Sequence, residues 1–133
     1  MNRKIEKIES NKAPAAIGPY SQAIVAGDYI FVSGQIPLDP ATGAVVQGGI
    51  KNQTTQVLQN LLAILIVRNL TFENVVKTEI FLTSMVNFGI VNEVYESFFD
   101  GDIKPARYVV EVSKLPKDVE IEISCTAFCM NRA

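Results

Sequence analysis

Residues 104–127, KPARYVVEVSKLPKDVEIEISCTA, decide the fold that we expect, because they read as two strands around a proline-containing turn. Side chains in a strand alternate between the two faces of a sheet. On the second strand, apolar residues therefore share one face and polar residues share the other. The apolar set is Val119, Ile121, Ile123 and Cys125, and the polar set is Glu120, Glu122, Ser124 and Thr126.

The two strands are expected to pair as a hairpin whose tight turn is centred on residues 116 and 117. That register sets Glu111 opposite Glu122 and Arg107 opposite Thr126. Arg107 and Glu122 then lie about 13 Å apart along the ladder, which is too far for an ion pair. They either flank a small ligand or belong to sites that another subunit completes. Two facing carboxylates also indicate a nearby cation or a raised pKa.

Arg107 is expected on a sheet face of mixed polarity. The polar face of an antiparallel sheet is ordinarily a solvated face, and that interpretation stays open for each residue. Pro105, however, fixes the backbone where the strand begins, and functional side chains often occupy such positions. A mixed face also fits a partly buried subunit interface. The residues expected on this face, away from the helices, are Arg107, Val109, Glu111, Glu122 and Thr126.

The chain as a whole predicts one α+β domain spanning residues 1–133. Strands are expected at 4–10, at 23–25, at 29–33 and at 74–82, before the two strands of residues 104–127. Helices are expected from residue 50 to a left-handed Asn69, and over residues 88–99. This order favours a mixed sheet with both helices on one face. The polar side of the first helix is expected to be exposed and comprises Gln53, Gln56, Gln59 and Asn60.

The absence of histidine from the sequence restricts the possible chemistry. It excludes Ser-His-Asp and Cys-His nucleophile systems and every metal site that needs an imidazole. Proton transfer falls to Glu, Asp, Lys, Tyr, Cys or water. The two cysteines, Cys125 and Cys129, would stand about 13 Å apart in a strand, which is beyond disulfide reach. We expect reduced thiols and no zinc or iron–sulfur site.

Charge and hydropathy indicate a cytoplasmic protein without a nucleic-acid surface. Twelve basic and fourteen acidic residues give a net charge of −2, and no basic run extends beyond Arg3 and Lys4. The N-terminus has no apolar stretch typical of a signal peptide. The longest apolar run, 61–67, is too short to cross a bilayer.

Several motifs occur in order along the chain: APAAIGPYSQA at 13–23, FVSGQIPLDPATG at 31–43, NVVKTEIFL at 74–82, PAR at 105–107 and LPKDVEIEI at 115–123. Together they resemble the RidA (YjgF/YER057c/UK114) family of enamine/imine deaminases over nearly the whole chain. The resemblance implies a chorismate-mutase-like two-layer fold. It also implies a homotrimer that packs its sheets around a central barrel, with three active clefts between neighbouring subunits.

The same resemblance implies hydrolysis of 2-enamino or 2-imino acids, such as 2-aminoacrylate and 2-iminopropanoate, to 2-keto acids and ammonia, without a cofactor or metal. Arg107 would bind the substrate carboxylate through its planar fork. Glu122 would deprotonate a water and return the proton to the leaving nitrogen. Tyr20, Ser33 and the Gly34 backbone would complete the cleft. Asn92 matches a further family position, although an asparagine on a helix face is more typical of a structural role.

The sequence departs from the family pattern at a few positions. Tyr108 stands where a small residue is common, Val109 where some members have cysteine, and Asn87 where aspartate is frequent. We expect these differences to alter the preferred substrate size. Two other functions stay open: a non-catalytic trimeric module that holds small carboxylates through Arg107, and an RNA-cleaving inhibitor of translation, against which the acidic composition argues.

Overall fold

The computed structural model describes residues 5–129, and over that range the chain forms one six-stranded sheet and two α-helices. The predicted order of elements and the α+β class are confirmed. The expected start of the first strand, residue 4, lies outside this range. In chain order the elements are β1 (Ile5–Ile8), β2 (Ala23–Ala26), β3 (Tyr29–Gln35), α1 (Gly49–Ile66), β4 (Val75–Leu82), α2 (Phe88–Phe98), β5 (Ala106–Glu111) and β6 (Ile121–Phe128).

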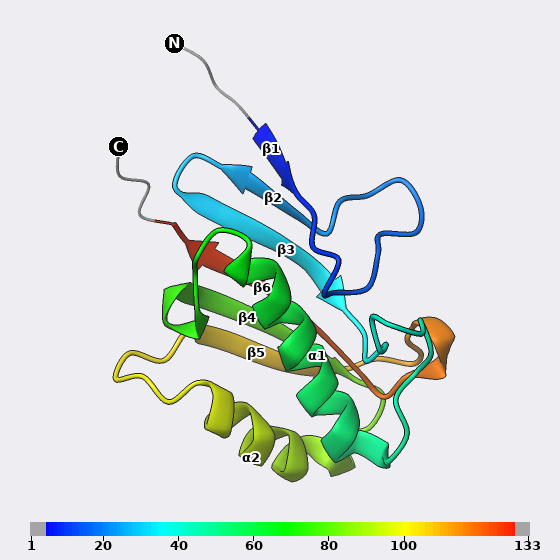
Figure 1. The fold of residues 1–133 in the computed structure, drawn as a ribbon. Helices are drawn as coiled ribbons and strands as arrows, with labels where there is room; N and C mark the ends of the chain where they lie inside the picture. Colours follow the sequence, from blue (N-terminus) through cyan, green and yellow to red (C-terminus); the bar gives the residue numbers. More distant parts are fainter. Residues whose placement is uncertain (1–4, 130–133) are drawn as a thin grey trace.

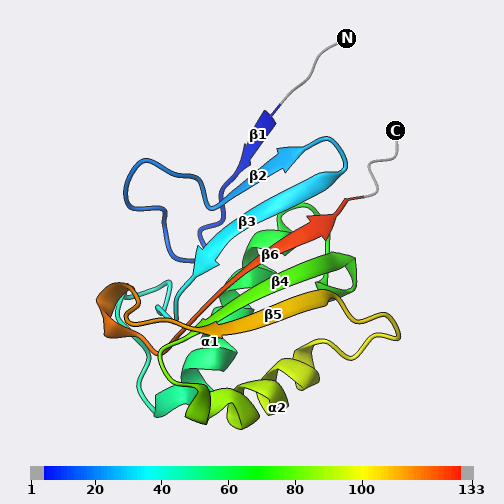
Figure 2. The ribbon, with the colours of Figure 1, turned by 180° about the vertical axis from the view of Figure 1, so that it is seen from behind.

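Both helices cover the same face of the sheet, as predicted (Figure 1). Viewed from behind, the other face carries no helix, and we call it the open face (Figure 2). The strand order is β1-β2-β3-β6-β4-β5, with β4 and β5 parallel and the other pairs antiparallel. Within residues 5–129, neither helix combines the length and the apolar character needed to cross a membrane.

The predicted hairpin of residues 104–127 is wrong. Strand β4 lies between β5 and β6, so these two strands do not pair. The predicted pair of Glu111 and Glu122 does not form. Glu111 is in register with Leu82 of β4, and Leu82 is in register with Ile121 of β6. The connection instead crosses over β4, and Leu115 and Val119 within it are buried.

The expected face of three residues is also wrong. The parallel register with β4 turns Arg107, Val109 and Glu111 toward the helix side, because they align with Thr78, Ile80 and Leu82, all of which are fully buried. Glu122 and Thr126 do lie on the open face, since they alternate with the buried core residues of β6.

Helix α1 follows the predicted periodicity but ends at Ile66, three residues before the predicted end at the left-handed Asn69. Val57, Leu58, Leu61 and Leu65 are completely buried, and Asn69 has a positive φ of 61° beyond the last turn. The expectation that its glutamine-rich side is exposed is wrong for two residues. Gln53 and Asn60 are 8% and 1% exposed, because the loops around residues 36–38 and 120 pack over them.

Asn60 attaches the long loop after β3 to the helix. Its Nδ2 donates to the carbonyl oxygens of Ile36 and Leu38 at 3.2 and 3.1 Å, and its Oδ1 accepts from Gln56 Nε2 at 2.8 Å. Two carbonyl groups of an irregular loop are thereby satisfied inside the protein. The Ile36 carbonyl also accepts from Leu38 N at 2.8 Å, so the buried polar side chain matters most for the carbonyl of Leu38.

Replacing Asn60 with leucine is expected to lower the free energy of unfolding by about 1 to 3 kcal/mol, since the Leu38 carbonyl loses its donor and the Ile36 carbonyl keeps only Leu38 N. The measurement is urea unfolding at a fixed protein concentration. The control is Gln59→Leu, at the exposed neighbouring position, where the change is expected to stay within about 0.5 kcal/mol. Equal losses in the two variants would contradict a specific role for Asn60.

Candidate active site

Arg107 projects from β5 toward α2 at the edge of the helix-covered face. Its Nη1 donates a hydrogen bond to Asn92 Oδ1 at 2.7 Å. The guanidinium carbon lies 4.8 Å from the ring centroid of Tyr95 and 5.8 Å from that of Phe88. The structure therefore brings together two predicted site residues, Arg107 and Asn92. The sequence reasoning missed the two rings around them, although Phe88, Asn92 and Tyr95 stand at positions that share one helix face.

Arg107 is held in place without being neutralised. Over residues 5–129, no Asp or Glu oxygen lies within 4.0 Å of its guanidinium, and the ion pairs of that range involve other cations. An arginine presents a planar fork of donors that matches a carboxylate. The exposed side chain is therefore suited to bind an anion from outside the subunit.

Glu122 lies on the opposite side of the sheet, against the backbone of β3. A Cβ atom at Gly34 would stand 2.9 Å from Glu122 Cδ, so the missing side chain of the glycine leaves the space that the carboxylate fills. Burial raises the pKa of the Glu122 carboxyl group above its usual value. Among residues 5–129, no donor compensates by binding the carboxylate.

Ser33 and Gly34 form a bulge in β3. The neighbouring residues Val32 and Gln35 align with Cys125 and Ile123, so the two bulge residues oppose one residue of β6. The Ser33 hydroxyl donates to the carbonyl oxygen of Ser21 at 2.6 Å. Its proton is thus engaged, and the oxygen offers lone pairs rather than a donor to a ligand.

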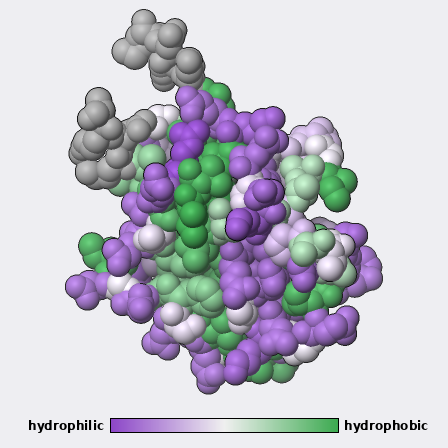
Figure 3. Space-filling model, viewed as in Figure 1, coloured by the Kyte–Doolittle hydropathy of each residue, from purple (hydrophilic) through white to green (hydrophobic). Residues whose placement is uncertain are grey.

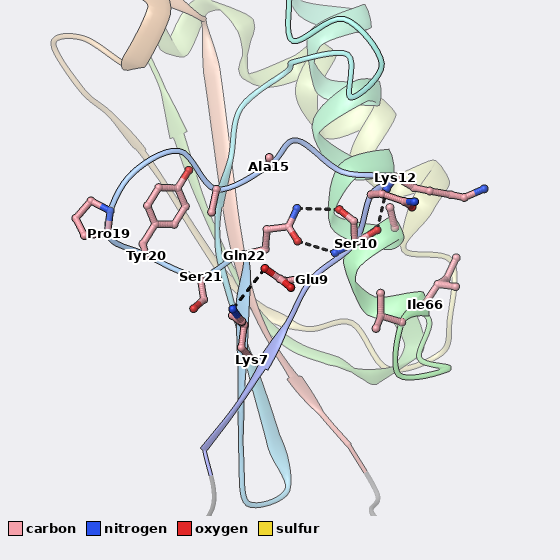
Figure 4. Close-up of a pocket in the computed structure, with 14 residues that line it drawn as sticks. Lys7, Glu9, Ser10, Lys12, Ala15, Pro19, Tyr20, Ser21, Gln22 and Ile66 are labelled. Atoms are coloured by element: carbon pink, nitrogen blue, oxygen red, sulfur yellow. Dashed lines mark hydrogen bonds and ion pairs between the residues drawn. The ribbon is translucent and has the colours of Figure 1, made fainter.

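Tyr20 lies in the loop between β1 and β2, and it is 54% exposed. It lines a cavity of about 980 Å³ (Figure 4). Gln22 shapes this loop, because its side chain accepts from Ser10 N at 2.7 Å and donates to Pro14 O at 2.7 Å. Of the six predicted site residues, Tyr20 alone lines the cavity.

The far wall of this cavity belongs to the end of α1. Ile66 and Val67 line it and are 55% and 43% exposed. Figure 3 shows hydrophobic side chains gathered over this end of the helix. The cavity thus separates an apolar wall from Lys7 of β1 and Lys12 of the loop that follows. It includes neither Arg107 nor Glu122.

Four of the six predicted site residues fall into two groups on opposite faces of the sheet, while Tyr20 lies apart beside the cavity. Arg107 and Asn92 lie toward α2, whereas Glu122 and Gly34 lie on the open face. The sheet itself separates the two charged groups.

Two positions that depart from the family pattern also have defined surroundings. Tyr108 points away from Arg107, and its ring lies 6.2 Å from that of Phe81 and 5.4 Å from Lys77 Nζ on the open face. Asn87 donates to Glu120 Oε1 at 3.3 Å. Tyr108 therefore does not narrow the space beside Arg107 within its own chain.

No metal centre is visible in the described part of the chain. Across residues 5–129, no three His, Cys, Asp or Glu side chains gather closely enough to hold an ion. Burial raises the pKa of the Cys125 thiol to about 12, with the Glu79 carboxylate adding to the shift. That thiol is a poor nucleophile at neutral pH.

The geometry can be compared with known proteins. Residues 10–129 match the profile of a family described as Endoribonuclease L-PSP, which is the YjgF/RidA family. The chain belongs to the RidA family. A mouse member named 2-iminobutanoate/2-iminopropanoate deaminase is 46% identical over 120 residues, covering 90% of this chain and 88% of the mouse protein.

Solved structures of RidA relatives share this fold. A putative endoribonuclease from Thermotoga maritima superposes with a TM-score of 0.91 at 52% identity, covering 95% of this chain and 98% of that one. The structure of E. coli TdcF with bound serine gives a TM-score of 0.88 at 38% identity, covering 96% and 99%. The two-layer fold is therefore that of the RidA family.

Replacing Gly34 with alanine is expected to push the Glu122 carboxylate off the sheet surface and to lower its pKa toward the usual value. The reason is that the new Cβ occupies the place of a flexible side-chain end, which yields toward solvent. The free energy of unfolding should change by less than about 1 kcal/mol. The measurement is an NMR titration of the Glu122 carboxyl carbon.

The control for this substitution is Gly89→Ala, because a Cβ at Gly89 meets nothing within 4 Å. It should leave the Glu122 titration unchanged. A Glu122 pKa that is the same in Gly34→Ala and in the native protein would show that the glycine does not set the position of the carboxylate.

Proposed function

We propose that this protein hydrolyses reactive 2-enamino and 2-imino acids, such as 2-aminoacrylate and 2-iminopropanoate, to 2-keto acids and ammonia. The observation that carries the proposal is the state of Arg107: an exposed cation, positioned by Asn92 and two aromatic rings, without a carboxylate beside it in residues 5–129. The missing anion is supplied by the substrate carboxylate. The name of the mouse relative and the serine bound to E. coli TdcF support this choice of ligand.

The reaction needs one water and two proton transfers from oxygen to nitrogen. Glu122 accepts a proton from the water as its oxygen attacks the C=N carbon and passes that proton to the nitrogen, which gives a neutral carbinolamine. Glu122 then takes the proton of the carbinolamine hydroxyl and returns it to the nitrogen as the C–N bond breaks, so that ammonia leaves and a 2-keto acid remains. An imine is already electrophilic, so orientation by Arg107 and modest acid–base assistance suffice. The raised pKa of Glu122 supports both roles, because it brings the group nearer to neutral pH.

We further propose that the working unit is a homotrimer, with sites between its subunits. The opposite placement of Arg107 and Glu122 supports this, since one chain alone does not offer both groups to a small substrate. The open face is the proposed contact surface. Its exposed aromatic residues include Tyr29, Phe31 and Tyr108, at 43%, 50% and 44% exposure.

Each chain contributes one domain to this assembly, and we place the reaction in the cytoplasm, where two free thiols stay reduced. Tyr20, Ser33 and the Gly34 backbone are proposed to line the cleft beside Glu122. No cofactor takes part in the proposed reaction.

The first test follows 2-iminopropanoate, generated in place by a dehydratase acting on serine. The native protein is expected to accelerate its decay, and Arg107→Ala to abolish most of that acceleration, because the carboxylate loses its charged partner. The loss should be about a hundredfold in kcat/KM, as for a charge-assisted hydrogen bond of about 3 kcal/mol. The readout is the rate of ammonia or pyruvate release.

The control is Arg68→Ala, which removes a different surface arginine, paired with Glu6 at 2.9 Å. It should keep the native rate. Failure of well-folded native protein to accelerate the decay would contradict the deaminase. Thermal stabilisation by small carboxylates without turnover would then favour the binding module, and salt-dependent RNA cleavage would favour the nuclease.

The second test is the pH dependence of Glu122. As the base, Glu122 acts when ionised, so kcat/KM should rise with pH as this group loses its proton. The midpoint of that rise should lie at a higher pH than the pKa of an ordinary carboxyl group. Glu122→Gln should be slow and lack this rise. The exposed Glu96→Gln is the control and should keep both the rate and the profile. A native pH profile in Glu122→Gln would assign the proton transfer to another group.

The same group links pH to stability. Because folding raises the pKa of Glu122, the protonated form is favoured in the native state. The free energy of unfolding of the native protein should therefore fall as pH rises from the usual carboxyl pKa through the raised one. Glu122→Gln should lack this fall and be the more stable of the two at pH 7, when both are compared at equal protein concentration.

A further inference from the structure

The surroundings of Arg107 form a cradle on α2. Phe88, Asn92 and Tyr95 stand four and three residues apart, so their side chains follow one edge of the helix. Asn92 binds one end of the guanidinium through a hydrogen bond of 2.7 Å. The rings of Tyr95 and Phe88 lie 4.8 and 5.8 Å from the guanidinium carbon. Both distances fall within the range of cation–π attraction.

Tyr95 is much more firmly fixed than a surface aromatic residue. It is 7% exposed, and its hydroxyl shares a hydrogen bond of 2.8 Å with Thr78 Oγ1. Its ring stacks on Phe99, with centroids 4.2 Å apart and planes tilted by 18°. Thr78 is also the residue of β4 in register with Arg107. The ring of Tyr95 is thus hydrogen-bonded to the residue of β4 that lies beside Arg107 in the sheet.

We propose that Tyr95 is a positioning residue, which holds the Arg107 guanidinium in the orientation that binds the substrate carboxylate. Phe88 is the second ring of the cradle. This inference rests on the proposed role of Arg107 as carboxylate anchor. The aromatic faces and the Asn92 amide carry no net charge. They therefore limit the orientations of the guanidinium and leave its positive charge available to bind an anion. An arginine ordered before binding loses less conformational freedom when the ligand arrives.

The alternative is that Tyr95 only fills the interior and that its closeness to Arg107 has no consequence for binding. Phe99 separates the two explanations. It is 4% exposed, stacks on Tyr95 and belongs to the same aromatic cluster, but it is absent from the contacts of Arg107. Truncating Phe99 therefore weakens the core beside Tyr95 while leaving the ring that faces Arg107.

The test uses the full-length protein and pyruvate as an unreactive probe, since pyruvate has the carboxylate of the proposed substrate and requires no turnover. Three variants are compared: Tyr95→Leu removes the ring, Tyr95→Phe keeps the ring and loses the hydroxyl, and Phe99→Leu perturbs the core behind it. Two quantities are measured: the Kd for pyruvate, and the NMR signals of the arginine Nε–H groups, assigned to Arg107 by its loss in Arg107→Lys.

Tyr95→Leu is expected to raise the pyruvate Kd about tenfold and to shift the Arg107 signal, because ring-current shielding and cation–π attraction are lost. Tyr95→Phe should stay within about threefold of the native Kd and keep the shifted signal. Phe99→Leu should resemble Tyr95→Phe. In an Arg107→Lys background, Tyr95→Leu should add less than about twofold, because no guanidinium remains to be positioned.

Equal Kd values for Tyr95→Leu and Phe99→Leu would overturn the proposal, as would a tenfold loss that persists in the Arg107→Lys background. If Tyr95→Leu fails to fold, Phe88→Leu at the half-exposed start of α2 takes its place, with an expected rise of about threefold. Pyruvate binding without imine hydrolysis would overturn the proposed deaminase while leaving this inference intact. Native protein that binds no pyruvate would overturn the cradle as a binding device.

Discussion

The parallel pairing of β5 with β4 is the constraint on which the rest of the site depends. It places Arg107 beside the buried Thr78 and turns the guanidinium toward α2. The antiparallel pairing of β6 on the other side of β4 turns Glu122 to the open face. An antiparallel β5 added by a hairpin would have put both charges on one face, about 13 Å apart along the ladder, so that one copy of the chain carried both.

Separation by a sheet keeps both groups in an unusual electrostatic state. Arg107 has no carboxylate partner in residues 5–129, and no donor of that range relieves the half-buried Glu122. The half-buried Glu122 carries a cost of burial, which the exposed Arg107 does not. In the proposed function, a substrate with a carboxylate at one end and a developing positive nitrogen at the other would interact with both groups where two copies of the chain meet. The unpaired charges of a single copy are thus compatible with a function that the assembly performs.

Local patterns in the sequence were sufficient to predict the helices and strands, but not which strands lie next to each other. The stripe of leucines predicts α1, and Asn69 predicts the left-handed residue beyond it, because both features depend on residues close in sequence. A hairpin and a crossover share the pattern of two strands around a proline. They differ in whether another strand, here β4, lies between the two, which depends on residues distant in sequence. The same limit hid Tyr95, which its spacing marks as a core residue, while its contact with Arg107 depends on strand order.

The neighbours of Arg107 suit the proposed role of this residue as a carboxylate anchor. An aspartate or glutamate in the place of Asn92 would hold the guanidinium more tightly, but it would also compete with the ligand for the same donors. A lysine would repel it. A neutral amide accepts one hydrogen bond, and two rings attract the cation through their faces, so the fork is oriented while its charge is retained. Because Tyr95 is itself fixed by Thr78, this arrangement connects the sheet register to the orientation of the anchor.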